Sequence, residues 1–157
     1  MKKILLTQGK YAKVDNSDFD LLDGWSWCVL SGNNNKLYAK RAVPNGAGKQ
    51  KFITMHSSIM KTPKGMEIDH IDGDGLNNQK SNLRICTHSE NIKNRTKSKN
   101  NKSGFKGVCW NKEKKKWKVY ISSNKKLFHL GYFLDKEEAY KAYCDACLKY
   151  HGEFSKF

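Results

Sequence analysis

One stretch in the middle of the chain alternates short apolar runs with turn-forming residues, and this pattern permits few folds. Residues 66–68 and 83–86 are each long enough for a short strand only, and residues 72–75, Asp-Gly-Asp-Gly, form a turn between them. Thr87 and Glu90 have the spacing of a capping box, in which two side chains bond the first free backbone N–H groups of a helix. The stretch therefore predicts a ββα unit whose helix starts directly after Thr87.

Oxygen-bearing and imidazole side chains are concentrated in this unit. A hard divalent cation prefers oxygen ligands, and the Asp69 carboxylate and the Asn91 amide supply them. His70 titrates near neutral pH and can accept a proton from water. Since adjacent residues of a regular strand face opposite sides, Asp69 and His70 converge only at a strand end or a distortion. The glycine turn just downstream predicts such an end, and the combination predicts metal-assisted hydrolysis of a phosphate ester.

The excess of positive charge predicts what the protein binds. The 157 residues contain 30 Lys and Arg but only 15 Asp and Glu, which gives a net charge of +15. Such a charge favours a polyanionic partner, and aromatic residues interleaved with the lysines favour nucleic acid over a membrane surface. No apolar run is long enough for a membrane span or a secretory segment. We therefore expect a cytoplasmic protein that binds double-stranded DNA, with no membrane partner and no obligate protein partner.

The five cysteines do not form the pattern of a disulfide framework or of a zinc site. Their odd number argues against structural disulfides in a cytoplasmic protein. Cys144 and Cys147 form a Cys-x-x-Cys pair, but no second pair lies near it, and a structural zinc ion normally has four ligands. Both residues fall in a helical pattern, where they can pack as small apolar side chains. We expect no structural zinc.

The C-terminal part predicts three strands followed by one helix. Residues 105–110, 117–122 and 127–133 have strand character, with a hairpin turn at residues 123–124, Ser-Asn. Residues 135–138, Asp-x-x-Glu, form a second capping box. The helix that follows carries an apolar stripe made of Ala139, Ala142, Tyr143, Ala146, Cys147 and Tyr150. This stripe is expected to pack on one face of the sheet and to leave the other face free.

The chain is thus expected to be an α+β protein with two domains. The expected parts are, in order, a first domain at 1–95 with its ββα core at about 66–95, a basic linker at 96–103, and a second domain at 104–157 in which a three-stranded antiparallel sheet packs on one helix. In the first domain, residues 1–50 predict short strands with turns, and residues 53–60 predict a short helix. Trp25 and Trp27 are expected in its core.

The ββα stretch resembles the HNH homing endonucleases of the ββα-metal type. The matching motifs are Asp69-His-Ile-Asp-Gly-Asp, then Asn-Asn, Ser-Asn82-Leu-Arg and His-Ser-Glu-Asn91, in that family's order and spacing. The resemblance implies that His70 is the general base and that Asp69 and Asn91 bind one divalent metal ion, Mg²⁺ or Mn²⁺. It also implies that Asn82 acts in catalysis by bracing the loop that holds the histidine. Many members of this family have histidine in place of Asn91, so the chain is an H-N-N variant.

Other polar residues near these motifs have structural or open interpretations. His56 could support the metal site, bind phosphate or simply pack, and His88, in the first turn of a helix, is expected on the surface. Asp72 and Asp74 are interpreted as turn residues. They do not form an EF-hand loop, because Leu76 stands where an oxygen ligand is required.

Residues 103–157 resemble the Apetala-2 DNA-binding domains known from plant ethylene-response factors and from phage homing endonucleases. The matching stretches are Ser-Gly-Phe-Lys-Gly-Val, Lys-Trp-Lys-Val-Tyr-Ile, His-Leu-Gly-Tyr-Phe, Glu-Glu-Ala-Tyr-Lys-Ala-Tyr and His-Gly-Glu-Phe. That family lays its three-stranded sheet in the major groove, with the helix behind. The resemblance and strand alternation together give the candidate DNA-binding residues Lys106, Lys112, Lys118, Tyr120, Ser122, Lys126 and His129, to which Arg84 of the first domain is added.

The chain departs from the plant members by offering lysine, cysteine and serine where they have arginine. Bidentate recognition of guanine is therefore less expected than contact with the DNA backbone. Alternation also directs Trp117, Val119 and Ile121 toward the helix. For Lys112 and the lysines at 114–116, a solvated turn and phosphate contact both remain open.

These patterns lead to the hypothesis of a metal-dependent DNA endonuclease of the phage homing type, which hydrolyses phosphodiester bonds at a target site. With one nucleolytic centre, a monomer is expected to nick one strand, whereas a dimer could cut both. If the protein is phage-encoded, it would act in the cytoplasm of the bacterial host. Two alternatives remain, a DNA-binding regulator with an inactive nuclease domain and a restriction or defence nuclease.

Overall fold

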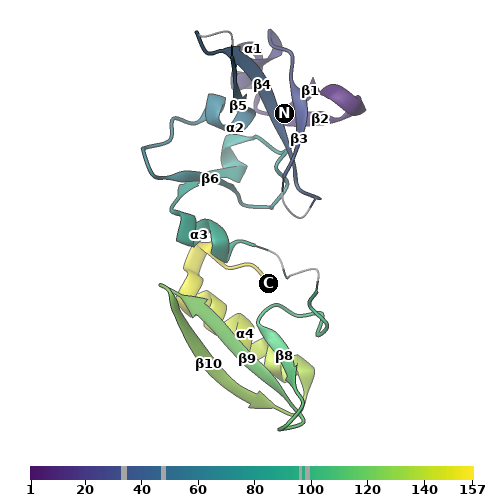
Figure 1. Cartoon of the computed structure of the whole chain (residues 1–157), viewed down its shortest axis with the longest axis vertical. Helices are drawn as coiled ribbons and strands as arrows, with labels where there is room; N and C mark the ends of the chain where they lie inside the picture. Colours follow the sequence, from purple (N-terminus) through teal and green to yellow (C-terminus); the bar gives the residue numbers. More distant parts are fainter. Residues whose placement is uncertain (33–34, 47–48, 96, 98–99) are drawn as a thin grey trace. The chain divides into compact units, whose positions relative to one another are not determined.

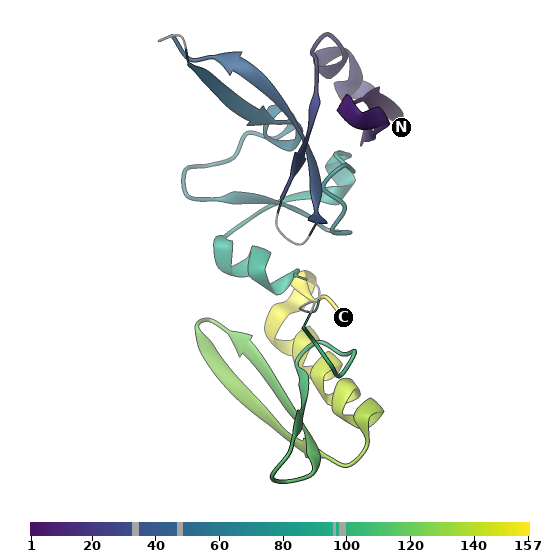
Figure 2. The ribbon, with the colours of Figure 1, turned by 45° about the vertical axis from the view of Figure 1, so that its right-hand side comes forward.

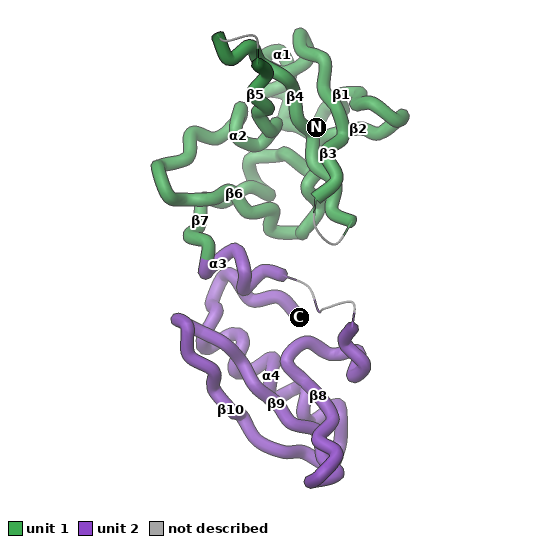
Figure 3. Tube along the Cα trace, viewed as in Figure 1, with its two compact units in different colours: residues 1–88 green, residues 89–157 purple. Residues whose placement is uncertain are grey.

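The computed structural model describes residues 1–32, 35–46, 49–95, 97 and 100–157, which form two compact units, residues 1–88 and residues 89–157 (Figure 3). Both units combine helices with small antiparallel sheets, in agreement with the α+β class. The predicted linker at 96–103 includes residues 96, 98 and 99, which lie outside the described residues. Among the described residues, no helix is long and apolar enough to cross a membrane.

The N-terminal part of the first unit contains two small sheets and two short helices (Figure 1). The first sheet pairs β1 (Lys2–Leu5) with β2 (Tyr11–Val14), and a 3-10 turn (Thr7–Gly9) lies between them. The second sheet has the order β3-β4-β5 and consists of β3 (Cys28–Ser31), β4 (Leu37–Pro44) and β5 (Gln50–Thr54). The helices are α1 (Asn16–Asp23) and α2 (Met55–Ile59). The predicted short helix at 53–60 corresponds to α2.

The helix α1 corrects the expectation that residues 1–50 form strands and turns only. Its sequence is short and acidic, with a buried side chain at Leu22 and a partly buried one at Phe19 as its contacts with the apolar core. Two apolar contacts in eight residues are too few to produce a recognisable helical period. Packing against the rest of the unit therefore decides the conformation of this segment.

The start of α1 also anchors a distant part of the chain. Asp15, at the N-cap position, makes no capping hydrogen bond. Its carboxylate instead accepts from the backbone N–H of Lys80 at 2.8 Å and from Nε2 of Gln79 at 3.1 Å. The ammonium of Lys80 lies 2.6 Å from the carboxylate of the buried Asp18. These contacts fix the segment that directly precedes Asn82.

The core of the first unit lies where its two small sheets and α1 meet. Its buried apolar residues are Ile4, Leu6, Ala12, Val14, Leu22, Trp27, Ala39 and Met55. Trp27 is buried as predicted, but the prediction for Trp25 was wrong, because this side chain is 53% exposed. Its indole ring lies 4.0 Å from the guanidinium of Arg41, a cation–π contact that partly covers the ring at the surface.

The ββα elements form where the sequence predicted them. The antiparallel strands β6 (Glu67–His70) and β7 (Leu83–Cys86) are followed by α3 (His88–Lys93). The boundary between the compact units lies between residues 88 and 89, so that most of α3 belongs to the second unit.

The second unit contains one three-stranded antiparallel sheet and one long helix. The sheet has the order β10-β9-β8, with β8 (Val108–Asn111), β9 (Lys116–Ser123) and β10 (Lys126–Phe133). The helix α4 (Lys136–His151) lies along one face of this sheet (Figures 1 and 2). Asp135 caps it as predicted, since its carboxylate accepts from the backbone N–H of Glu138 at 2.8 Å. The buried apolar residues between the two layers are Val108, Val119, Ile121, Ala139, Tyr143, Ala146 and Cys147.

Two local features of this sheet differ from the expected boundaries. The β9–β10 turn lies at Asn124 and Lys125, one residue later than predicted, and both have positive φ, 51° and 61°. This conformation twists two antiparallel strands in the favoured sense. The strand β8 starts at Val108 rather than at residue 105, because Gly107 turns the chain with a φ of 74°. A Cβ at Gly107 would lie 2.2 Å from the Tyr143 ring, so this turn presses the backbone against α4.

Candidate functional site

The imidazole of His70 is buried at the end of β6, directly before the glycine turn. Its Nε2 lies 3.4 Å from Oδ1 of Asn78, and its ring centroid lies 5.1 Å from that of His56 and 5.8 Å from that of Tyr38. Burial lowers the pKa of His70, an effect that the Asn78 hydrogen bond and the nearby carboxylates only partly oppose. The ring is therefore held in its neutral form, which is the form that can accept a proton.

The turn after His70 is fixed by Asn82. The Asn82 amide donates to Oδ1 of Asp72 at 2.9 Å and to the carbonyl of Asn77 at 2.8 Å, and its oxygen accepts from the backbone N–H of Asp72 at 3.0 Å. Asp72 and Asp74 each accept a backbone N–H two residues downstream, which is the arrangement expected of turn residues. Burial raises the pKa of Asp72, but hydrogen bonds from Asn77, Asp74 and Asn82 outweigh this and lower it overall. The turn is therefore held together around an ionised carboxylate.

The same turn is joined to the N-terminal strands. Lys13 on β2 donates its backbone N–H to the carbonyl of Leu76 and accepts from the backbone N–H of Asn78, both at 2.8 Å. Gly75 lies so close to β4 that a Cβ would be 2.4 Å from the carbonyl of Leu37. Residues 1–50, for which no functional role was predicted, thus hold the turn that follows His70.

Asp69 forms a buried ion pair with Arg84. The two residues face each other across β6 and β7, and the Nε and Nη2 atoms of Arg84 lie 3.0 and 2.8 Å from Oδ2 of Asp69. Asp69 is only 4% exposed, and the Arg84 side chain only 12%. Arg84 was predicted to contact DNA, but the structure directs its guanidinium to Asp69, where it offsets the charge of the carboxylate. Its role in DNA binding stays a prediction.

His56, which the sequence left with three interpretations, lies beside His70. It lies in the first turn of the short helix α2, and its Nε2 lies 2.9 Å from the hydroxyl of Thr54. Its Nδ1 is buried and has no hydrogen-bond partner among the described residues. Burial, with a smaller contribution from His70, lowers the pKa of His56 to about 4. Two neutral imidazoles therefore lie side by side in this unit.

Sequence patterns did not identify Tyr38 and Asn78 as neighbours of His70. Tyr38 precedes the motif by more than thirty residues, in a strand whose sequence shows no functional pattern. Asn78 is fully buried and belongs to the Asn-Asn pair of the motif, for which no individual role was predicted. Its proximity to the asparagine-rich turn was the one available signal.

The proposed metal ligands have the right chemistry for a hard cation. Asp69 supplies a carboxylate, and Asn91, on α3, supplies an amide oxygen. Both are ligands that suit Mg²⁺ or Mn²⁺ rather than a soft metal. Within the described part of the chain, no group of three or more His, Cys, Asp or Glu residues could hold a metal ion.

The sheet of the second unit presents polar side chains on the face opposite α4. Burial alternates along β9 as predicted, because Val119 and Ile121 are buried whereas Tyr120 and Ser122 are exposed. Lys118 lies on the same face as these exposed residues and is half-buried. Lys112, Lys126 and His129 are exposed as well. The outer face therefore offers cationic, hydroxyl and aromatic groups together.

Lys106, which precedes β8, differs from the candidates on this sheet. Its Nζ donates to the carbonyls of Lys93 at 2.7 Å and of Lys156 at 3.3 Å, and its side chain is partly buried. Burial is the main reason why the pKa of this lysine is lowered. Lys106 was expected to project toward DNA, but the structure directs its ammonium group to these two carbonyls.

Comparison with known proteins identifies both parts of the chain. Residues 61–93 match the model of the HNH endonuclease family, and residues 103–153 match that of the AP2 domain. Protein 3.8 of Escherichia phage T7 is 37% identical over 95 residues, which cover 60% of this chain and 78% of that protein. The chain belongs to the HNH endonuclease family. No solved structure matches it.

In this HNH endonuclease the HNH match covers β6, the Asn82 turn, β7 and α3, and the AP2 match covers the three-stranded sheet and α4. The Cys144-x-x-Cys147 pair lies within the AP2 match, on α4. Cys147 is buried, with its Sγ 3.4 Å from Nδ1 of His151, and both cysteines are free thiols. The family assignment supports nuclease activity and DNA binding.

Proposed function

We propose that this HNH endonuclease is a metal-dependent endodeoxyribonuclease of the homing type, which hydrolyses phosphodiester bonds at a target site in double-stranded DNA. The main support is the arrangement around His70. A neutral, buried imidazole follows the Asp69 carboxylate directly in the chain and precedes a turn that Asn82 holds by three hydrogen bonds. Neutral imidazole beside a hard-metal ligand is suited to hydrolysing a phosphate ester.

In the proposed reaction His70 removes a proton from water. A hydrogen bond from Nε2–H to Asn78 Oδ1 makes Nδ1 the nitrogen that accepts this proton. The water oxygen attacks phosphorus, the bond to the 3′ oxygen breaks, and a 5′-phosphate and a 3′-hydroxyl result. Asp69 and Asn91 would hold the metal ion. When bound, a divalent cation offsets the negative charge that develops on the phosphate and on the leaving oxygen.

The AP2 domain is proposed to hold the target DNA. Its sheet presents Lys118, Tyr120 and Ser122 outward, and the candidate cations are lysines rather than arginines. Lysine is a point charge without the bidentate geometry that reads guanine. These residues therefore supply affinity and register on the DNA backbone more than base selection. Acting as a monomer with one nucleolytic centre, the enzyme nicks one strand.

The test is cleavage of supercoiled plasmid that carries the DNA flanking this gene. Wild-type protein, His70→Ala and the control His88→Ala are compared in Mg²⁺, in Mn²⁺ and in EDTA. His88 is the matched control, because its side chain is 68% exposed and pairs with Glu67 rather than with the His70 cluster. A discrete cut that needs metal and is lost only in His70→Ala, while DNA binding persists, supports the proposal.

Two other outcomes would replace it. Tight DNA binding without cleavage in either metal would indicate a regulator with an inactive nuclease domain, a candidate favoured by the Arg84 guanidinium that already pairs with Asp69. Metal-dependent cleavage scattered over DNA of any sequence would indicate a restriction or defence nuclease. Linear product alone, from protein shown to be monomeric, would exclude the nicking reaction.

A further inference from the structure

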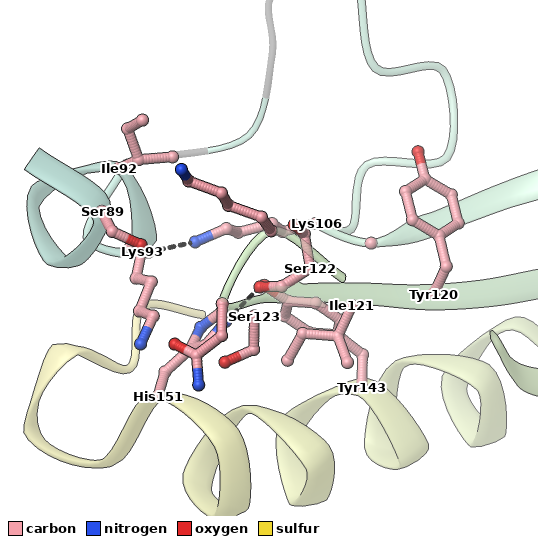
Figure 4. Close-up of a pocket in the computed structure, with 13 residues that line it drawn as sticks. Ser89, Ile92, Lys93, Lys106, Tyr120, Ile121, Ser122, Ser123, Tyr143 and His151 are labelled. Atoms are coloured by element: carbon pink, nitrogen blue, oxygen red, sulfur yellow. Dashed lines mark hydrogen bonds between the residues drawn. The ribbon is translucent and has the colours of Figure 1, made fainter. Parts of the chain in front are cut away.

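Lys106 connects three segments of the second unit through its terminal amine. The Nζ atom donates to the carbonyl of Lys93, the last residue of α3, and to the carbonyl of Lys156 near the C-terminal end. The carbonyls of the last turn of a helix have no partner within that helix, and a positive charge there interacts favourably with the helix dipole. Lys106 therefore supplies a cationic cap to the end of α3 (Figure 4).

The backbone from which Lys106 extends is held firmly. The next residue, Gly107, accepts a hydrogen bond from the backbone N–H of Tyr120 at 3.0 Å and packs against the ring of Tyr143. Just upstream, the buried Ser103 donates its hydroxyl to the carbonyl of Val108 at 2.7 Å. The main chain at Lys106 is thus fixed to both β9 and α4, and the side chain reaches α3 from there.

The helix α3 is short and depends on contacts with the rest of the protein. It contains six residues, and none of them is buried. Helices this short are not stable on their own in water and depend on contacts with the rest of the protein. A specific polar contact at its last residue therefore has a large influence on where α3 lies.

The space next to α3 in the second unit is a pocket rather than a packed core. The pocket has a volume of about 330 Å³, and Ile92, Lys93, Lys106, Tyr120, Tyr143 and His151 are among the residues that line it (Figure 4). Because this space is not filled by side chains, loss of the Lys106 contact would leave α3 room to move. Apolar packing cannot replace the hydrogen bond at that position.

We infer that Lys106 is a positioning residue for the nuclease site, which fixes α3, with the proposed metal ligand Asn91, to the strand of the AP2 sheet that presents Tyr120 and Ser122 to DNA. Asn91 lies two residues before Lys93 in the same helix, so a shift of its last residue also moves the amide oxygen. This inference rests on the proposed function. It links the domain that holds the target to the residue that holds the metal, and it assigns Lys106 a role other than DNA contact.

The test compares Lys106→Met with Lys118→Met. Methionine retains much of the length of lysine and removes the donor, and Lys118 lies on the outer face of the same sheet. Replacing a residue that orients a metal ligand typically costs about 10- to 100-fold in metal affinity or activity. For Lys106→Met we expect a single-turnover cleavage rate reduced by about tenfold or more at limiting Mg²⁺, a Mg²⁺ midpoint raised by a similar factor, and recovery at high Mg²⁺. DNA affinity should stay near that of wild type, and Lys106→Arg should restore part of the activity.

Lys118→Met should show the opposite pattern, with weaker DNA binding and an unchanged Mg²⁺ midpoint. If Lys106→Met weakens DNA binding and leaves the Mg²⁺ midpoint unchanged, Lys106 is a DNA contact and the inference is wrong. If Lys106→Met does not fold, Lys106→Leu, which also lacks a donor, is measured in the same way. The same raised midpoint supports the inference, and a wild-type midpoint overturns it.

Hydrogen exchange of the α3 amides separates this inference from the proposed function. If wild-type protein cuts no DNA, the proposed function fails, but faster exchange of these amides in Lys106→Met than in Lys118→Met still shows that Lys106 holds the helix. Equal exchange in the two variants overturns the inference, whatever the wild-type protein does to DNA.

Discussion

The turn after His70 and the outer face of the AP2 sheet are both polar, but they are built in opposite ways. In the turn, the side chains of Asp72 and Asn82 bond to each other and to backbone groups, Asn78 bonds to His70, and this imidazole is buried and neutral. On the sheet, apolar residues lie against α4, and polar residues such as Tyr120 and Ser122 project outward. Function in the first region depends on exact placement of a few groups, whereas function in the second depends on charge and shape that several residues share.

The comparison predicts the largest effect for the buried ion pair. Replacing Arg84 with Met leaves the Asp69 carboxylate without its cation, and breaking a buried pair in this way costs about 3–5 kcal/mol. Urea unfolding followed by circular dichroism should show this loss at neutral pH. The matched control Lys126→Met removes an exposed cation from the sheet and should change stability by less than about 0.5 kcal/mol. Equal losses of unfolding free energy in the two variants would contradict the distinction between the buried turn region and the exposed sheet.

The second prediction concerns pH and His56. The pKa of His56 falls from 6.5 to about 4 on folding, so below pH 6.5 the unfolded chain binds more protons than the folded one. The stability that this pKa difference contributes is thus fully present above pH 6.5. It is lost as the pH falls toward 4, by up to about 3 kcal/mol. The unfolding free energy of wild type and His56→Gln, measured from pH 7 to pH 4, should show a smaller decline in the variant. The exposed His129, replaced by Gln, should leave the decline unchanged, and a decline common to all three proteins would contradict the prediction.

The third prediction concerns Asn82. Asn82→Ala removes three hydrogen bonds and leaves polar groups of the turn unpaired, which should cost about 1–3 kcal/mol of stability. Cleavage should fall by about 100-fold, because His70 is no longer held in place, while DNA affinity changes little. Asn91→Asp is the informative comparison, since it keeps an oxygen ligand and should retain metal-dependent cleavage. If Asn82→Ala loses DNA binding rather than cleavage, the role of Asn82 is in DNA binding.

The smallest effect is expected on the sheet. Lys118→Met should reduce the slope of log affinity against log salt concentration by about 1, with a uniform loss of affinity across DNA sequences. Fluorescence anisotropy at several salt concentrations measures this slope. Lys64→Met, which removes an exposed cation from the first unit, should leave the slope unchanged. If the loss depends on DNA sequence, Lys118 reads bases rather than phosphates.

Elements whose sequence signals are local were predicted well. The strand β7 coincides with the predicted residues 83–86, α3 starts directly after Thr87, and Asp135 caps α4. Each depends on residues within one turn or one strand. Strand alternation likewise predicted which side chains of β9 are buried.

Features that depend on distant residues were not predicted. The helix α1 is stabilised by contacts that its acidic sequence does not reveal, and Trp25 lies at the surface, where Arg41 of β4 partly covers its ring. The motif predicted His70, Asp69 and Asn82 as a group and left a supporting role for His56 open, but it predicted neither the guanidinium of Arg84 nor the ring of Tyr38. Long-range pairing decides these contacts, and periodicity carries no information about it.

The backbone bonds between Lys13 and the turn around Leu76 have a consequence for transplanting the motif. The stretch that matches the HNH family begins at residue 61, but the turn within it is completed by a strand nearly fifty residues earlier in the chain. A graft of the matched segment into another protein would therefore carry the residues of the motif without the strand that holds their turn. The smallest segment of this chain that would keep those backbone bonds starts at β1, well before the motif itself.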